Sequence, residues 1–178
     1  MAIKKSITFE GLKYNLDDRD RIAADATLQS GGTFSLDTRL QYNNIVSGSD
    51  VATTMSVATH GGRTTFVPNV TADRIYTLPQ VAEGLHIHMI GAGALAADGH
   101  DLSVVTETAG TEFFHGAIIH HDTDQTSQTS ATVWCNGTSE DTIKLDVLEA
   151  FDLHFVGRST TVWYVYGWTA GATPVTCA

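Results

Sequence analysis

The sequence has little cysteine, proline and lysine, and each shortage narrows the class of protein. Only Cys135 and Cys177 occur in 178 residues, too few for a disulfide framework, so we expect free thiols in a reducing compartment. No apolar run approaches the roughly 18 residues of a membrane span, and the first residues lack the apolar region of a signal peptide. The sequence therefore predicts no membrane partner.

Positive charge is also scarce, with 10 lysines and arginines against 20 aspartates and glutamates. The resulting formal net charge of -10 repels nucleic acid and anionic membranes, so we expect neither as a direct partner. Threonine, glycine, valine and alanine are abundant, which favours strands and turns over helices. The length is enough for one sizeable core, with or without an arm.

The clearest periodic pattern runs from Asp141 to Trp168. Apolar and polar side chains alternate in residues 141–147 and again in residues 151–155. Period-2 alternation is typical of a strand with one face in the core. Turn residues follow at Gly157–Thr160, so residues 161–168 are predicted to return as the second strand of a hairpin.

The last of these strands is apolar on both faces. Trp163 and Val165 point one way, and the other face carries Val162, Tyr164, Tyr166 and Trp168. A strand of this kind needs cover on both sides. A second sheet can cover one face of this strand. The other face can be covered by the N-terminal segment or by another subunit. Because aromatic residues are enriched in interface cores, Tyr164, Tyr166 and Trp168 are candidate subunit-interface residues.

Five further strands are expected between Arg74 and this stretch, at residues 75–78, 85–90, 102–106, 113–120 and 132–135. Short strands are also expected between Thr33 and Pro68, joined by turns at residues 47–49 and 61–62. The regular spacing of strands and turns is typical of a β-sandwich. The predicted fold is all-β, a sandwich domain over residues 36–178, and eight strands in two sheets favour a jelly roll.

Residues 1–35 differ from the rest and are predicted to form an extended N-terminal arm. Ile7 and Phe9 can belong to a short strand, and residues 15–27 can form one or two helical turns. Apolar residues in this segment are too sparse to offset the entropy of ordering, so we expect a partner to order it. The alternative is a surface segment that packs on its own domain.

Two histidines are the main candidates for metal chemistry. His86 and His88 lie on the same face of one expected strand, and this spacing resembles the metal motif of cupins. No glutamate follows in residues 89–93, however, and Gly84 is too close to the first histidine for the motif. The sequence does not place a third ligand among the remaining candidates, His115, His120, His121 and Glu112. We therefore expect no stoichiometric metal, with His86 and His88 as weak candidates.

Other catalytic signatures are missing. The sequence contains neither a Gly-x-Ser-x-Gly nucleophile turn nor a phosphate-binding glycine loop, and neither cysteine has an activating neighbour in sequence. Acidic pairs such as Asp146 with Glu149 are typical of solvated strand edges. The sequence therefore predicts no catalytic residues and no cofactor.

Several strand ends and turns together resemble β-rich virion proteins of tailed bacteriophages, namely capsid decoration (cement) and head-fibre-like proteins. The resemblance spans roughly residues 70–175 and carries no catalytic residues. Its segments are Ile75–Pro79, Gly84, Gly99–Ser103, Phe114–Ile119, Asp141–Leu145, Trp163–Gly167 and Thr169–Pro174.

This resemblance implies a non-enzymatic structural protein that is made in the host cytoplasm and binds the major capsid protein on the outside of the virion. It also implies a homo-oligomer, specifically a trimer. A tail or head-fibre module is the alternative within the same class. A cupin-like metal-binding enzyme is the alternative from another class, and it rests on His86 and His88.

Overall fold

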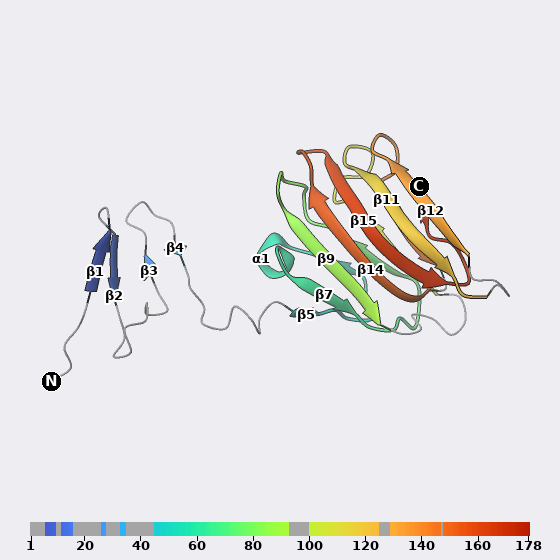
Figure 1. Ribbon diagram of the computed structural model, residues 1–178, viewed down its shortest axis with the longest axis horizontal. Helices are drawn as coiled ribbons and strands as arrows, with labels where there is room; N and C mark the ends of the chain where they lie inside the picture. Colours follow the sequence, from blue (N-terminus) through green and yellow to red (C-terminus); the bar gives the residue numbers. More distant parts are fainter. Residues whose placement is uncertain are drawn as a thin grey trace. The chain divides into compact units, whose positions relative to one another are not determined.

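The computed structural model describes residues 45–92, 100–124, 129–146 and 148–178, together with four short strands nearer the N-terminus (Figure 1). The chain divides into two compact units, Met1–Asn44 and Ile45–Ala178. In the first unit β1 (Ser6–Phe9) pairs with β2 (Leu12–Asn15), and β3 (Ala26–Thr27) pairs with β4 (Thr33–Phe34), both antiparallel.

The sequence predicted a short strand at Ile7 and Phe9, and both residues lie in β1. The predicted helical turns include residues 16–25, which lie outside the described part of the chain. The predicted ordering of the arm by a partner also concerns residues that are mostly outside it.

The second unit is a sandwich of two sheets, which confirms the predicted all-β fold. Figure 1 shows the strands of the larger sheet side by side. The seven-stranded sheet has the order β12 (Ser130–Asn136), β11 (Phe113–Asp122), β15 (Val162–Gly171), β14 (Leu148–Gly157), β9 (His86–Ala92), β7 (Thr64–Val67) and β5 (Ile45–Ser47). The five-stranded sheet has the order β16 (Thr176–Cys177), β13 (Thr142–Asp146), β10 (Asp101–Val105), β8 (Arg74–Thr77) and β6 (Thr53–Thr54).

All eight strands expected after Arg74 are present, and the predicted hairpin is the antiparallel pair of β14 and β15. Both sheets are mixed, with parallel pairs such as β11 with β15 and β10 with β8. The strand order therefore differs from that of a purely antiparallel, eight-stranded jelly roll. A single turn of helix, α1 (Val57–His60), was not expected, although Ser56 caps it by accepting a hydrogen bond from the Thr59 N–H.

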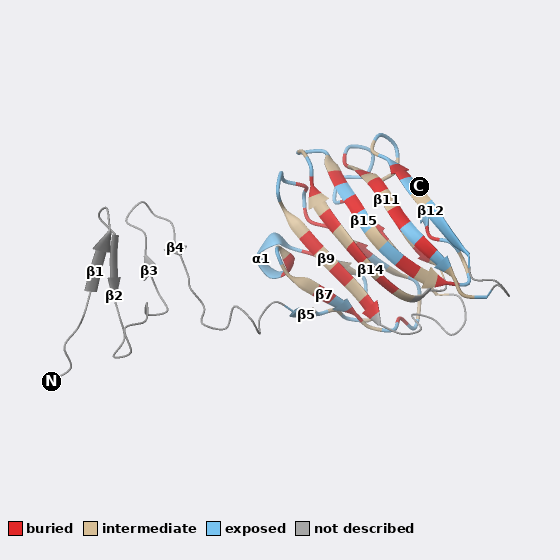
Figure 2. Ribbon diagram, viewed as in Figure 1, coloured by how far each residue is buried: buried red, intermediate tan, exposed pale blue. Residues whose placement is uncertain are grey.

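The core lies between the two sheets and follows the alternation seen in the sequence. In β14 the side chains of Phe151, Leu153 and Phe155 are fully buried, and the residues between them are partly exposed (Figure 2). Trp163 and Val165 of β15 are also fully buried. The five-stranded sheet contributes Tyr76, Leu102, Val104, Ile143 and Leu145 from its inner face.

Cys135 and Cys177 form a disulfide, so the expectation of free thiols is wrong. The two residues are 42 positions apart, but their Cα atoms lie 5.5 Å apart, within the usual range for a disulfide. Cys135 belongs to β12 and Cys177 to β16, which are edge strands of different sheets. The spacing in sequence could not show this proximity, because it arises from the way the sheets are stacked.

Candidate functional site

The outer face of the seven-stranded sheet, opposite the core, is the candidate functional surface. Strand register places its side chains in three rows across the sheet, two from β7 to β12 and one from β9 to β12. The central row contains Thr64, His88, His154, Tyr166, Ala117 and Trp134. The first flanking row contains Phe66, Ile90, Asp152, Trp168, Ile119 and Thr132, and the second contains His86, Val156, Tyr164, His115 and Asn136.

Large apolar side chains are exposed on this outer face. Tyr164, Tyr166 and Trp168, which the sequence singled out as interface candidates, are 43%, 42% and 40% exposed. Trp134 on the edge strand is 71% exposed and Ile119 on β11 is 46% exposed. These two residues were missed, because neither stands in an obviously two-faced apolar run.

Formal charge is nearly absent from the three rows. Asp152 is the only carboxylate in them, and they contain no lysine or arginine. For a chain with a formal net charge of -10, such a surface is unusual. Charged residues are depleted and aromatic residues enriched in the cores of protein interfaces. This surface has that composition.

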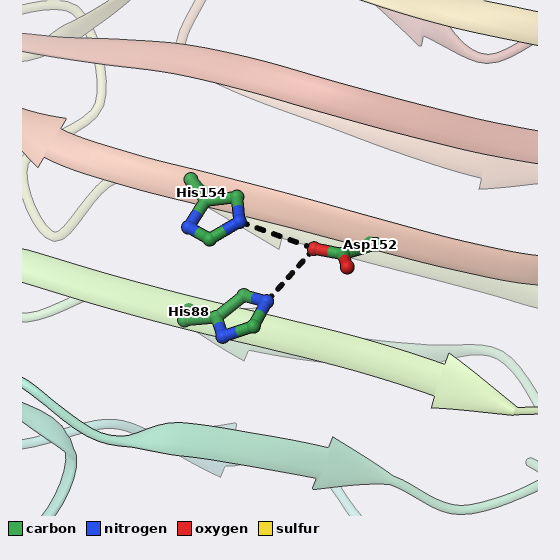
Figure 3. A group of neighbouring side chains, drawn as sticks. All are labelled: His88, Asp152 and His154. Atoms are coloured by element: carbon green, nitrogen blue, oxygen red, sulfur yellow. Dashed lines mark hydrogen bonds and ion pairs between the residues drawn. The ribbon is translucent and has the colours of Figure 1, made fainter.

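A cluster of histidines and one carboxylate lies on the same outer face, over β9 and β14 (Figure 3). The carboxylate Oδ1 of Asp152 lies 2.8 Å from Nε2 of His88 and 3.3 Å from Nε2 of His154. One nitrogen from each ring and one carboxylate oxygen thus lie within 4.8 Å of one another. Among the described residues, this is the group of histidine, cysteine, aspartate or glutamate side chains whose spacing suits a metal ion.

The second nitrogen of each ring in the cluster has its own partner. Nδ1 of His88 lies 2.9 Å from the hydroxyl of Thr64, and Nδ1 of His154 lies 3.1 Å from Nε2 of His86. Thr64 is the neighbour of His88 on β7, and His86 lies two residues before His88 on β9. These contacts fix both rings, because each imidazole is held through both nitrogens.

Ring stacking also orients the cluster. The ring of His154 lies between those of His88 and Tyr166, with centroid distances of 4.0 and 4.8 Å and nearly parallel planes. Partial burial lowers the pKa of His86 and of His154, and the neighbouring His88 lowers both further. The carboxylate of Asp152 opposes the shift in the pKa of His154. The neutral imidazole is therefore favoured at His86 and His154.

The other metal-ligand candidates from the sequence lie apart from this cluster. His115 lies beside Arg158, and His121 contacts Ser130 on the edge strand. His120 and Glu112 are buried, with 1% and 2% of their surfaces exposed. None of the four joins His86 and His88.

Asp152 and His154 were not recognised as site residues. A signal was present, because Asp152 and His154 have the same period-2 spacing as His86 and His88. The sequence did not show that β9 and β14 are neighbours, with His88 directly opposite His154. That pairing joins segments more than 60 residues apart and depends on the whole sheet.

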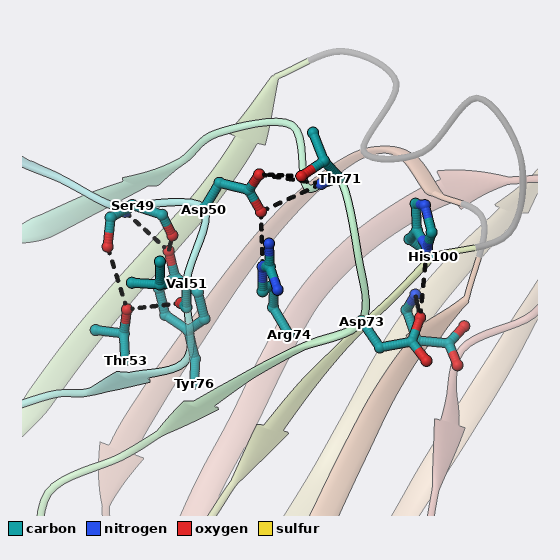
Figure 4. A network of polar contacts seen from close by, with 10 residues as sticks. Ser49, Asp50, Val51, Thr53, Thr71, Asp73, Arg74, Tyr76 and His100 are labelled. Carbon is teal, nitrogen blue, oxygen red and sulfur yellow. Dashed lines mark hydrogen bonds and ion pairs between the residues drawn. The ribbon is translucent and has the colours of Figure 1, made fainter.

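A separate polar network connects the loops near β6 and β8 (Figure 4). Asp50 accepts a hydrogen bond of 2.7 Å from Nε of Arg74 and further hydrogen bonds from the backbone and hydroxyl of Thr71. The hydroxyl of Tyr76 donates to the carbonyl of Ser49 at 2.7 Å. The Arg74 and Thr71 contacts lower the pKa of Asp50 from 3.8 to about 2. This network is structural, since it ties a loop to the core through a fully buried tyrosine.

No protein-family model, curated protein or solved structure matches this chain. Among the described residues, no helix has the length and apolar character needed to cross a membrane.

Proposed function

We propose that this protein is a non-enzymatic structural subunit that associates with other copies of itself through the outer face of its seven-stranded sheet. The observation that carries the proposal is the composition of the three rows, which are rich in exposed aromatic residues and nearly free of charge. In an interface core, such residues supply most of the binding free energy.

A second copy of the chain is the proposed occupant, and the outer face is where two chains of like charge can approach most closely. Each chain has a formal net charge of -10, so two copies repel one another across most of their surfaces. The outer face allows close approach, because Asp152 is the only carboxylate in its three rows and accepts a hydrogen bond from His88 of its own chain. Closed symmetric assemblies are the usual product of self-association, and the trimer is the form that the phage resemblance implies.

The proposed biological setting is the outside of a phage head, where the protein decorates and strengthens the shell by binding the major capsid protein. Support comes from the resemblance of residues 70–175 to decoration proteins and from the acidic composition. A charge of this sign suits the exterior of a capsid better than an interior packed with DNA. A tail or head-fibre module would use the same self-association at another place on the virion.

Sedimentation at micromolar concentration tests the self-association. The wild-type chain is expected to form an oligomer, and the double variant Tyr164→Ser/Trp168→Ser to shift toward the monomer. The matched control is Ile75→Ser, which removes a side chain that is 49% exposed on the other sheet and should leave the oligomer intact. A wild-type monomer, or equal dissociation of the control, would remove the basis for the proposed interface.

Addition of the purified protein to capsids that lack it tests the decoration role. The expected result is saturable occupancy of the shell together with a higher temperature of thermal rupture. The Tyr164→Ser/Trp168→Ser variant should bind more weakly, because fewer linked subunits attach at once. Wild-type protein that oligomerises but neither binds nor strengthens the shell would favour the head-fibre alternative.

A further inference from the structure

We propose that His88, Asp152 and His154 form a binding site for a divalent transition metal, and that zinc suits its ligand chemistry best. The three side chains project from neighbouring strands, and the carboxylate oxygen lies between the two imidazole nitrogens (Figure 3). The distances from that oxygen are 2.8 and 3.3 Å. In a tetrahedral zinc site with bonds of about 2.0–2.2 Å, donor atoms stand about 3.3–3.6 Å apart.

The types of ligand favour zinc over the hard cations. Calcium and magnesium prefer sites made of oxygen atoms, whereas this cluster offers two imidazole nitrogens and one carboxylate oxygen. Two histidines and one carboxylate make a ligand set that zinc accepts in proteins, with a further position left for water. In the single chain the side chains of His88, Asp152 and His154 are 17%, 31% and 26% exposed, so an ion and its water can reach the site before the proposed association covers this face.

The hydrogen bonds around the cluster have the pattern seen around histidines that bind a metal. Histidines that bind a metal generally make a second hydrogen bond through the other ring nitrogen, which fixes the tautomer and the ring orientation. Thr64 is placed to accept a hydrogen bond from Nδ1–H of His88, and Nε2 of His86 is placed to accept one from Nδ1–H of His154. With the ion bound, both Nε2 atoms are then free of protons and can bind it, and Nε2 of His88 gives up the hydrogen bond that it makes to Asp152 without the ion.

The expectation of no metal at His86 and His88 rested on a missing carboxylate and a missing third ligand. The fold supplies both from β14, a strand that is distant in sequence. It also changes the role of His86, which contacts His154 and not the carboxylate. The proposed ligand set is therefore His88, Asp152 and His154, with His86 and Thr64 as positioning residues.

Titration of the metal-stripped, full-length chain with Zn²⁺ by calorimetry is the main experiment. Saturable binding of one ion per chain is expected, and Asp152→Asn and His88→Gln should each weaken binding at least tenfold. The matched control is His121→Gln, which removes an exposed histidine from the same sheet face and should bind zinc like the wild type. Thr64→Val should weaken binding by about tenfold, since it removes only a contact to a ligand.

Substitution with Co²⁺ gives a readout of the ligand set. Visible absorption bands typical of tetrahedral cobalt are expected in the wild type and in the His121→Gln control, and should be lost in His154→Gln. Circular dichroism of each variant shows whether the fold is retained, and Asp152→Asn serves if a histidine variant does not fold. Absence of saturable binding, or equal affinity in Asp152→Asn and the wild type, would overturn the proposal.

Discussion

Cys135 and Cys177 join the edge strands of the two sheets through a disulfide, with Cα atoms 5.5 Å apart. The bridge links β12 of the seven-stranded sheet to β16 near the C-terminus. It therefore fixes the two layers to each other along one side of the sandwich. Because 42 positions separate the cysteines, the bridge closes a large loop and restricts the unfolded chain strongly.

Loss of this disulfide should lower the free energy of unfolding by about 2–4 kcal/mol, a typical value for a native bridge. The comparison is urea unfolding of the wild type, with and without reductant, against the double variant Cys135→Ala/Cys177→Ala. The wild type should lose stability on reduction, and the double variant should not respond to the reductant. Two reactive thiols in denatured but unreduced protein would contradict the bridge.

Asp50 should make the protein sensitive to acid over a defined range. The hydrogen bonds from Arg74 and Thr71 lower the pKa of Asp50 from 3.8 to about 2. A lowered carboxyl pKa stabilises the folded state above the unfolded-state value, and this contribution is lost as the pH falls from about 4 to 2. In Asp50→Asn, unfolding midpoints measured across this range should change less with pH than in the wild type. The control is Glu83→Gln at an exposed carboxylate, which should retain the wild-type dependence.

His120 should produce a second pH dependence near neutrality. Its side chain is buried, Nδ1 lies 2.9 Å from the Thr169 hydroxyl, and burial lowers its pKa below 6.5. Asp122 opposes this shift, and His121 adds to it. As the pH falls below about 6.5, the unfolded chain takes up a proton before the folded chain does, so the free energy of unfolding decreases. Stability is recovered as the pH rises again.

The variant His120→Asn tests this dependence, because its amide can still contact Thr169 but does not titrate. The free energy of unfolding should be lower than that of the wild type at pH 7, owing to the smaller side chain, and should fall less between pH 7 and pH 5. His115→Asn, nearer the start of the same strand and beside Arg158, is the control. If the free energy of unfolding of His120→Asn falls between pH 7 and pH 5 as much as that of the wild type, other groups cause the acid sensitivity.

The strands could be predicted from the sequence because their signal is local. The alternation in Phe151–Phe155 and the turn at Gly157–Thr160 each depend on a few adjacent residues, and both features are present in the structure. The two-faced pattern of β15 also separated Tyr164, Tyr166 and Trp168 from Trp163 and Val165, and the structure exposes the first three and buries the other two. A periodic pattern reports which way a side chain points, whatever the strand pairs with.

The pairing of distant strands could not be predicted in the same way. The disulfide depends on two edge strands that meet only when the sheets stack, and the histidine cluster depends on β9 lying beside β14. Polar residues at 152 and 154 looked like an ordinary solvated face until His88 was placed opposite His154. Both features follow from contacts between segments far apart in sequence, which periodicity does not report.

Gly167 connects the fold to the outer face and gives the last prediction. It lies in β15 between Tyr166 and Trp168, with φ at +143°, and a Cβ added there would stand 2.0 Å from the backbone oxygen of Asp152. Gly167→Ala should therefore strain β15 and push it away from β14 where Asp152 is held.

We expect a loss of about 2–3 kcal/mol in the free energy of unfolding of Gly167→Ala, measured by urea denaturation. Gly62→Ala is the matched control, because Gly62 also has a positive φ, of +67°, but a Cβ there meets nothing within 4 Å. Gly62→Ala should lower the free energy of unfolding by only about 1 kcal/mol, the cost of the backbone conformation alone. Equal losses in the two variants would mean that the close approach of β14 to β15 at Gly167 contributes nothing beyond backbone strain. A larger loss in Gly167→Ala, together with weaker zinc binding, would show that the contact also positions Asp152.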